Sequence, residues 1–305
     1  MSRQLRGNIL FMITALVWGV SFVSQSVGVD MVLPNTFNGV RMLLGSAVLL
    51  PVIFVNDTIK KKNGTFVSQK SNKYLWIGGV VCGAVLCGAS TIQTYGLVYT
   101  TAGKSAFITA LYIIFVSVIG IFMGKKSGKN TVIGIITALL GMYFLCLYGN
   151  ALDINKGDVL TFFCSILFSV HIICVDYFSP KADGVKLSCL QFFTCGVINS
   201  IIMFIMDKPS VSDILACTLP ILYSGIMSCG VAYTLQIIGQ KDTDPTIASI
   251  LMSFESVFAA ISGWVLLSEA MTRFEILGCV LMFVAIIIAQ VPQGKIFFKK
   301  NQTNV

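Results

Sequence analysis

Apolar segments of about 20 residues recur along the whole chain, with only short polar connectors between them. A membrane-spanning helix needs about 20 mainly apolar residues. Hydrocarbon offers backbone groups no water, and only helices and closed barrels satisfy those groups internally. The sequence lacks the alternating pattern of strands, so helices are the predicted spanning elements. We therefore predict an all-α polytopic membrane protein.

Composition supports the same class. Of 305 residues, 56% are hydrophobic and only 11% are charged, against about 25% charged in ordinary globular domains. So few charges cannot cover the water-facing surface of two soluble domains, which excludes an ordinary cytosolic enzyme. We predict ten transmembrane helices, at residues 8–28, 32–55, 74–98, 103–123, 131–149, 157–178, 187–206, 212–238, 246–268 and 273–291.

The lysines and arginines predict the orientation. With the N-terminus inside, 16 of the 21 fall on the inner side, four fall outside, and Arg41 lies within a span. Positive residues near span ends stay cytoplasmic, so we predict a multi-pass protein of the cell membrane with both termini cytoplasmic. Arg3 and Arg6 precede an apolar run of spanning length without a convincing cleavage site, which favours a retained first span.

Ten spans divide into two sets of five, at residues 1–150 and 151–305, the second with a short basic tail. An odd number per set means that the second set enters the membrane from the opposite side. Weak self-similarity supports this division. At a shift of 150 residues, Gly7 and Trp18 correspond to Gly157 and Phe168. We predict two inverted five-helix repeats around a central cavity.

Several motifs resemble the EamA family of the drug/metabolite transporter superfamily, and the resemblance covers essentially all ten spans. They are WGVSF at 18–22, Pro34 with Arg41, YTTAGKSAF at 99–107, GVAYTLQIIGQ at 230–240 and FESVFAAISGWVLLSEAMT at 254–272. The resemblance implies two inverted repeats, a shared cavity and alternating-access movement of small metabolites, often amino acids. The family usually has a proline in the fourth and ninth spans, where this chain has Tyr112 or a neighbour and Ser256.

Ionisable residues inside spans are the strongest functional candidates, because a charge at the bilayer centre costs about 2.5–3.5 kcal/mol even on lenient scales. Arg41 could bind a substrate carboxylate or phosphate, or could be a structural arginine paired with a buried acid. Glu255 could bind an amine or carry a coupling proton, or could be a fixed partner of Arg41. His171 could relay protons or could be a neutral histidine bonded between helices. Lys104 is expected to snorkel to the interface.

Other polar and aromatic residues recur at helical spacing and form stripes on several spans. Small and hydroxyl residues in such stripes serve helix packing more often than ligand contact. The stripes include Gln25, Thr109, Phe168 and Gln236. The predicted substrate-binding set is Trp18, Ser21, Asn38, Arg41, Thr94, Tyr112, His171, Tyr233 and Glu255.

The ten cysteines all fall in predicted spans without CxxC pairs, which indicates packing residues and neither disulfides nor a metal site. With one histidine and no clustered acids, we expect no metal and no cofactor. We also expect no nucleic acid, because the basic residues follow topology. The expected partners are a small-molecule substrate and the lipid bilayer, with a homodimer left open.

Three functions compete. The favoured one is a secondary transporter that exports an amino acid or a similar zwitterion. An anion or nucleotide-sugar exchanger would share the architecture but should need more than one cavity cation. An intramembrane serine enzyme would need Ser228 and His171 on facing helices, and the sequence has no GxSxG motif.

Overall fold

The computed structural model describes residues 3–68, 72–124, 128–146, 155–267 and 272–290. All regular secondary structure in these ranges is helical. In this part of the chain, eight helices are long and apolar enough to cross a bilayer, and two shorter apolar helices lie at Lys129–Gly141 and Ile276–Ala285, where the fifth and tenth spans are predicted. The predicted all-α membrane fold is confirmed.

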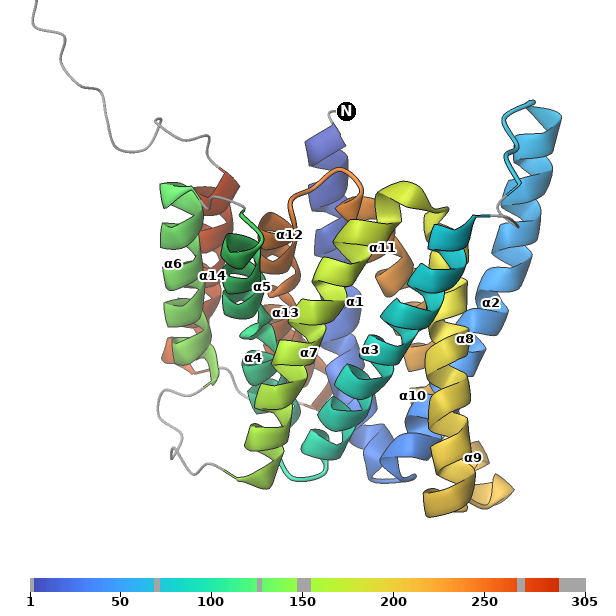
Figure 1. Ribbon diagram of the computed structural model, residues 1–305. Coiled ribbons are helices and arrows are strands. Elements are labelled where there is room, and N and C mark those ends of the chain that lie inside the picture. Colours follow the sequence, from blue (N-terminus) through green and yellow to red (C-terminus); the bar gives the residue numbers. More distant parts are fainter. Residues whose placement is uncertain (1–2, 69–71, 125–127, 147–154, 268–271, 291–305) are drawn as a thin grey trace, which may run out of the picture.

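The elements follow the predicted order and form a single bundle (Figure 1). The first half contains α1 (Arg3–Val29), α2 (Pro34–Lys62), α3 (Lys73–Leu97), α4 (Ala102–Ala110), α5 (Tyr112–Phe122) and α6 (Lys129–Cys146). The second half contains α7 (Lys156–Phe178), η1 (Ser179–Lys181), α8 (Gly184–Ile202), η2 (Met203–Asp207), α9 (Val211–Ala216), α10 (Thr218–Leu222), η3 (Tyr223–Tyr233), α11 (Thr234–Gln240), α12 (Pro245–Met252), α13 (Glu255–Leu267) and α14 (Arg273–Gln290). The proposed junction near residue 150 lies outside the described residues.

The two halves run through the bundle in opposite senses. Helix α1 begins on the face where the N-terminus lies, and α7 begins on the opposite face (Figure 1). Contacts between the halves come in matching sets. Helix α1 packs on α12 and α13 as α7 packs on α4 and α5, and α3 packs on α7 as η3 and α11 pack on α1. The pairs α2 with α8 and α6 with α14 map onto themselves. This exchange pattern is the one expected of inverted repeats related by a two-fold axis in the membrane plane.

Small residues let the halves approach closely. A Cβ atom at Gly19 of α1 would lie 2.4 Å from Cβ of Phe258 and 2.8 Å from the backbone nitrogen of Ala259 in α13. Backbone cannot yield as a flexible side chain can, so the α1–α13 contact requires glycine here. Such contacts are typical of helices that associate in lipid, where packing replaces a hydrophobic driving force.

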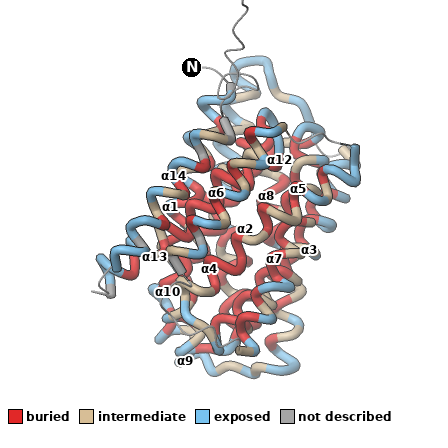
Figure 2. The backbone as a smooth tube through the Cα atoms, turned by 90° about the vertical axis from the view of Figure 1, so that its left-hand side faces the viewer, coloured by how far each residue is buried: buried red, intermediate tan, exposed pale blue. Residues whose placement is uncertain are grey.

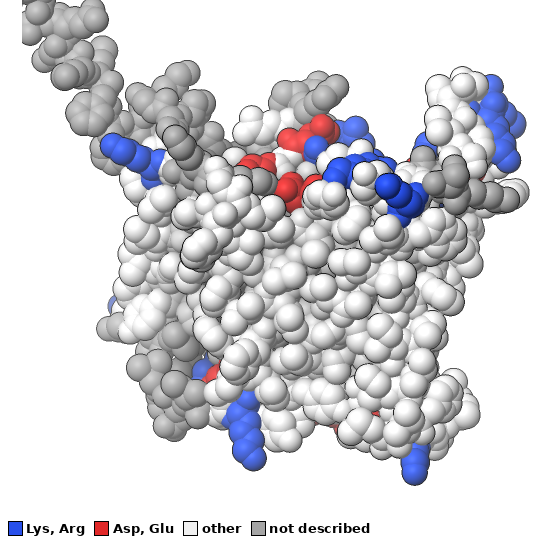
Figure 3. Space-filling view, viewed as in Figure 1, with Lys and Arg blue, Asp and Glu red and all other residues white. Residues whose placement is uncertain are grey.

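The distribution of charged and buried residues is the one expected of a membrane-spanning bundle. On the face shown in Figure 3, most charged side chains gather at the two ends, and the broad band between them is almost entirely uncharged. In Figure 2, buried residues line the inner faces of the helices, and exposed residues lie along the outside. Large exposed hydrophobic side chains on several helices, such as Phe122, Phe163 and Leu219, belong to that outer surface.

The fourth and ninth spans are both interrupted, although neither has a proline at the break. Helix α4 ends at Ala110 and α5 begins at Tyr112, while α12 ends at Met252 and α13 begins at Glu255. At the second break, the hydroxyls of Ser253 and Ser256 donate to the carbonyls of Ile250 and Ser253, both at 2.8 Å. Serine bonding back to the preceding turn bends helices. The breaks therefore occur without the family's usual prolines.

On the face opposite the N-terminus, an ion pair joins α4 to α7. Nζ of Lys104 lies 2.6 Å from Oδ2 of Asp158, and Asp158 also accepts a hydrogen bond from Thr100. The Lys104 side chain is 21% exposed. At this end of the bundle, Lys104 thus reaches an acid from the other half of the chain. That it snorkels to the membrane interface stays a prediction.

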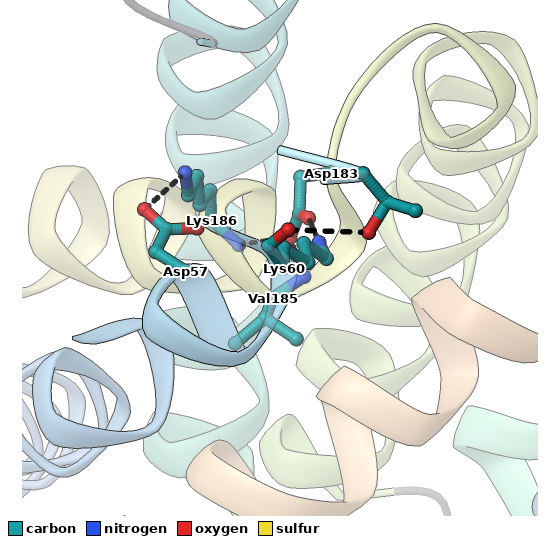
Figure 4. A network of polar contacts seen from close by, with 6 residues as sticks. Asp57, Lys60, Asp183, Val185 and Lys186 are labelled. Carbon is teal, nitrogen blue, oxygen red and sulfur yellow. Dashed lines mark hydrogen bonds and ion pairs between the residues drawn. The ribbon is translucent and has the colours of Figure 1, made fainter. Parts of the chain in front are cut away.

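On the N-terminal face, two crossed ion pairs join α2 to the start of α8 (Figure 4). Lys60 Nζ lies 2.6 Å from Asp183 Oδ2, and Lys186 Nζ lies 2.8 Å from Asp57 Oδ2. Both helices carry the same D-x-x-K pattern and the patterns pair head to tail, which fixes the axial register of the two helices. Asp183 also caps α8, since its Oδ1 accepts from the backbone N–H groups of Val185 and Lys186.

Burial alone would raise the pKa of the Asp183 carboxyl, but hydrogen bonds from Lys60 and from the Lys186 backbone, together with nearby lysine charge, hold its pKa below the ordinary value of 3.8. A depressed carboxyl pKa stabilises the fold above the unfolded pKa, and this stability is lost as pH falls through the folded pKa.

We expect Asp183→Asn, which keeps the capping oxygen, to lower stability at pH 7 by roughly 0.5–1 kcal/mol, a range discounted for the exposure of Lys60. The wild type should lose this advantage on acidification below about pH 4. Thermal unfolding in detergent between pH 7 and pH 3 measures it. Asp213→Asn at the exposed α9 cap is the control, and an acid dependence equal in wild type and Asp183→Asn would contradict the assignment.

Candidate functional site

Arg41 is held in place by side chains of α2 and α3. It is 3% exposed, its Nε donates to Asn38 Oδ1 at 2.9 Å, and its Cζ lies 5.2 Å from the ring centroid of Phe37. Asn38 in turn donates through Nδ2 to Thr94 Oγ1 at 3.1 Å. The ion pairs of the described residues do not include Arg41. Its guanidinium is therefore oriented by neutral groups and keeps its charge available.

Glu255 is the first residue of α13, directly after the break in the ninth span. It is 3% exposed, and its Oε1 has no hydrogen-bond partner among the described residues. No ion pair within 4.0 Å joins it to Arg41 in the described part of the chain. The interpretation of Glu255 as a fixed partner of Arg41 is thus not supported.

Aromatic rings cluster around Tyr233, at the end of the π-helical segment η3. Its ring centroid lies 4.6 Å from that of Trp18 and 6.0 Å from that of His171, both edge-on. Edge-to-face rings at these distances attract one another. Trp18 Nε1 donates to no group among the described residues. Helices α1 and α7 and segment η3 thus contribute to one aromatic wall with a free indole donor.

His171 bonds to a neighbour on α8. Its Nε2 lies 3.1 Å from Gln191 Oε1, and since an amide oxygen only accepts, Nε2 carries the proton in the assigned amide orientation. Its Nδ1 has no partner in the described ranges. The bond occupies Nε2 and leaves Nδ1 without a partner among the described residues.

These side chains surround a central cavity. Its empty volume is about 480 Å³, of which only about 30 Å³ accommodates the centres of water-sized molecules. Little of this space is wide enough for a water molecule, so a solute of several heavy atoms needs the side chains to move. The cavity is lined by Trp18, Phe22, Gln25, Arg41, Gln93, Thr109, Tyr112, Phe168, His171, Ile172, Ser228, Tyr233, Gln236 and Glu255.

Six of the nine residues expected at the site line this cavity: Trp18, Arg41, Tyr112, His171, Tyr233 and Glu255. The other three are not among its lining residues. Asn38 and Thr94 hold Arg41, and Ser21 accepts a hydrogen bond from Gln25 at 3.4 Å. These three lie behind the wall and position residues that form it.

The predicted set omitted eight lining residues. Gln25, Thr109, Phe168 and Gln236 lay in the polar and aromatic stripes, where a preference for packing over ligand contact kept them out. Ser228 was considered only as a nucleophile. Gln93 carried a signal, since a glutamine inside a span needs a polar neighbour. Phe22 and Ile172 carried none, because apolar residues do not reveal which face of a spanning helix meets a cavity.

Polar atoms without partners converge on the cavity. Among the described residues, Gln25 Oε1, Tyr112 OH, Gln236 Oε1 and Glu255 Oε1 are buried and unbonded. Leaving a buried polar group unsatisfied costs about 1–3 kcal/mol, and sites that bind ligands supply such groups. With one cation, one acid and several acceptors, the cavity can bind a polar solute that carries both charges.

Apolar crossings in two inverted sets around a polar central cavity define a multi-pass membrane protein of the transporter class. The model of the EamA-like transporter family matches residues 5–147 and 155–290, and the chain belongs to this family. The family consists of transporters, not enzymes, so the intramembrane enzyme hypothesis is set aside.

Relatives agree with this assignment. The chain is 27% identical over 289 residues to an uncharacterized transporter of Archaeoglobus fulgidus, which covers 94% of this chain and 86% of the relative. It is 24% identical to the uncharacterized transporter YoaV of Bacillus subtilis, with 88% and 90% covered. A solved crystal structure shares the fold with a TM-score of 0.75 at 16% identity and covers 93% of this chain and 96% of its own.

Proposed function

We propose that this transporter moves a small zwitterionic metabolite, such as an amino acid, by alternating access. One observation carries the proposal: a buried cation, Arg41 on α2, and a buried acid, Glu255 on α13, line the same cavity without pairing with each other. A free amino acid carries a carboxylate for the first and an ammonium for the second. An arginine and a glutamate that are both ionised in hydrocarbon are costly, and a zwitterion would compensate both.

The rest of the cavity suits such a solute. Tyr233 lines the same cavity as Arg41 and Glu255, so all three belong to one site. Trp18 and Tyr233 offer ring surface to an apolar side chain of the solute. An anion exchanger is disfavoured because Arg41 is the one cation among the described lining residues.

Alternating access is supported by the tightness of the cavity and by its construction from both halves. A solute cannot enter the small free space unless the walls separate, and rocking of inverted repeats around a fixed site is the common way to do this. Export as the direction rests on family resemblance alone.

We expect Arg41→Gln and Glu255→Gln each to reduce uptake of labelled amino acids into proteoliposomes at least tenfold, because a hydrogen bond to a charged group contributes about 1.5–3 kcal/mol. The wild type should also discriminate against methyl esters and deaminated analogues. Arg41→Gln should abolish discrimination against the ester only. Arg6→Gln, the same change at an exposed site, is the control, and normal flux in both cavity variants would refute their roles.

His171 and Glu255 are our candidates for proton coupling. If transport moves protons, a dye inside the liposomes should report acidification that tracks flux. His171→Asn should uncouple the two and leave solute exchange measurable, and Glu255→Gln should lower acidification by a larger factor than it lowers solute flux. Acidification that persists in both variants would remove these residues from the proton path.

We further propose that the protein lies in the plasma membrane with both termini in the cytoplasm. The support is the excess of lysine and arginine on the N-terminal side. A reporter that fluoresces only in the cytoplasm, fused to the C-terminus, should be bright, and one active only outside should be silent. The reverse result would invert the topology without affecting the fold.

A further inference from the structure

A second, larger basin opens on the N-terminal face, away from the central cavity. It accommodates the centres of water-sized molecules over about 310 Å³ within an empty volume of about 670 Å³. Its walls come from the end of α2 and the connector after it, the junction between α7 and α8, and the end of α11. The lining residues are Asp57, Lys60, Thr65, Val67, Pro180, Lys181, Ala182, Asp183, Lys186 and Lys241.

The basin has an excess of positive charge, with four lysines against two aspartates. The crossed pairs seen in Figure 4 use both aspartates, since Asp183 bonds Lys60 and Asp57 bonds Lys186. Among the described residues, Lys181 and Lys241 form no ion pair. The two aspartates are neutralised by their own lysines, so the charges of Lys181 and Lys241 are in excess. An anion that enters the basin is therefore attracted to these two lysines.

Aromatic side chains place this basin at the level of lipid headgroups. Nζ of Lys181 lies 3.0 Å from the ring centroid of Tyr177 and 5.2 Å from that of Tyr74. Both tyrosines are exposed, Tyr177 at 52%. Tyrosine and lysine side chains at a membrane boundary mark the interface between headgroups and hydrocarbon.

We propose that the basin binds the phosphate group of an anionic phospholipid in the leaflet on the N-terminal face. Lys181 and Lys241 would contact the phosphate, and the exposed surfaces of Val67 and Tyr177 would lie beside the upper acyl chain. Basic pockets between membrane helices bind anionic headgroups in this way. The inference concerns a site remote from the solute and holds whatever the protein transports.

The test compares two double variants with equal charge loss. Lys181→Gln with Lys241→Gln removes the two unpaired cations of the basin. Lys156→Gln with Lys208→Gln removes two exposed lysines from the opposite face. Native mass spectrometry of the purified full chain measures binding of phosphatidylglycerol, with phosphatidylcholine of the same acyl chains as the uncharged reference.

The basin double variant should bind phosphatidylglycerol roughly 30-fold more weakly than the wild type. The opposite-face variant should change affinity less than about threefold, since single surface charges act only within a Debye length of about 8–10 Å. Asp183→Asn should act in the other direction and tighten binding, because it removes an acid from the basin. Phosphatidylcholine should bind all variants alike.

Inorganic phosphate, tested by thermal stabilisation in detergent, separates the two sources of the same group. If it stabilises the wild type and not the basin variant, while phosphatidylglycerol binds the wild type no better than phosphatidylcholine, the phosphate site stands and a lipid as its source is overturned. Equal loss of phosphatidylglycerol binding in both double variants, or no loss in either, overturns the site itself. None of these measurements involves solute flux, so they are independent of the proposed transport function.

Discussion

Hydrocarbon offers no hydrogen-bond partner, and this constraint organises the whole molecule. Each spanning segment must satisfy its backbone as a helix, and each polar side chain within a span must find a partner inside the protein. The polar side chains of α2, α3, α7 and α8 therefore turn inward, where Asn38 bonds Thr94 and His171 bonds Gln191. The same inward face leaves a few groups unbonded, and those groups form the cavity.

At the breaks in the fourth and ninth spans, which occupy corresponding places in the two halves, the backbone must be satisfied in another way. A helix that stops inside the membrane leaves backbone groups without their usual partners, so the break must be compensated locally. Ser253 and Ser256 do this by bonding carbonyls of the preceding turn. The compensation places Glu255 at the start of a new helix within the bilayer. Tyr112 holds the same position in the first half, and both residues line the cavity.

The architecture could be predicted from the sequence because the bilayer directly dictates the length of each apolar segment and the placement of charged residues. The sequence also identified Arg41 and Glu255, because charge within a span is costly wherever the helix faces. It could not separate Asn38 from Arg41, since both lie on one face of α2 and only packing decides which one reaches the cavity. That packing depends on contacts between distant segments, such as Gly19 against Phe258. The breaks without proline were equally unpredictable, because serine is compatible with straight and bent helices alike.

The two repeats differ in sequence, and as a result they contribute different charged groups to the cavity. Two identical inverted repeats would place the same side chains on both sides of the axis, and such a site could not distinguish the two ends of a solute. At the shift of 150 residues, Arg41 corresponds to Gln191, and Gln191 bonds His171 instead of offering a charge. The cation is therefore confined to the first half, and Glu255 places the acid in the second. A symmetric fold thus carries an asymmetric cavity, as the proposed binding of a zwitterion in a single orientation requires.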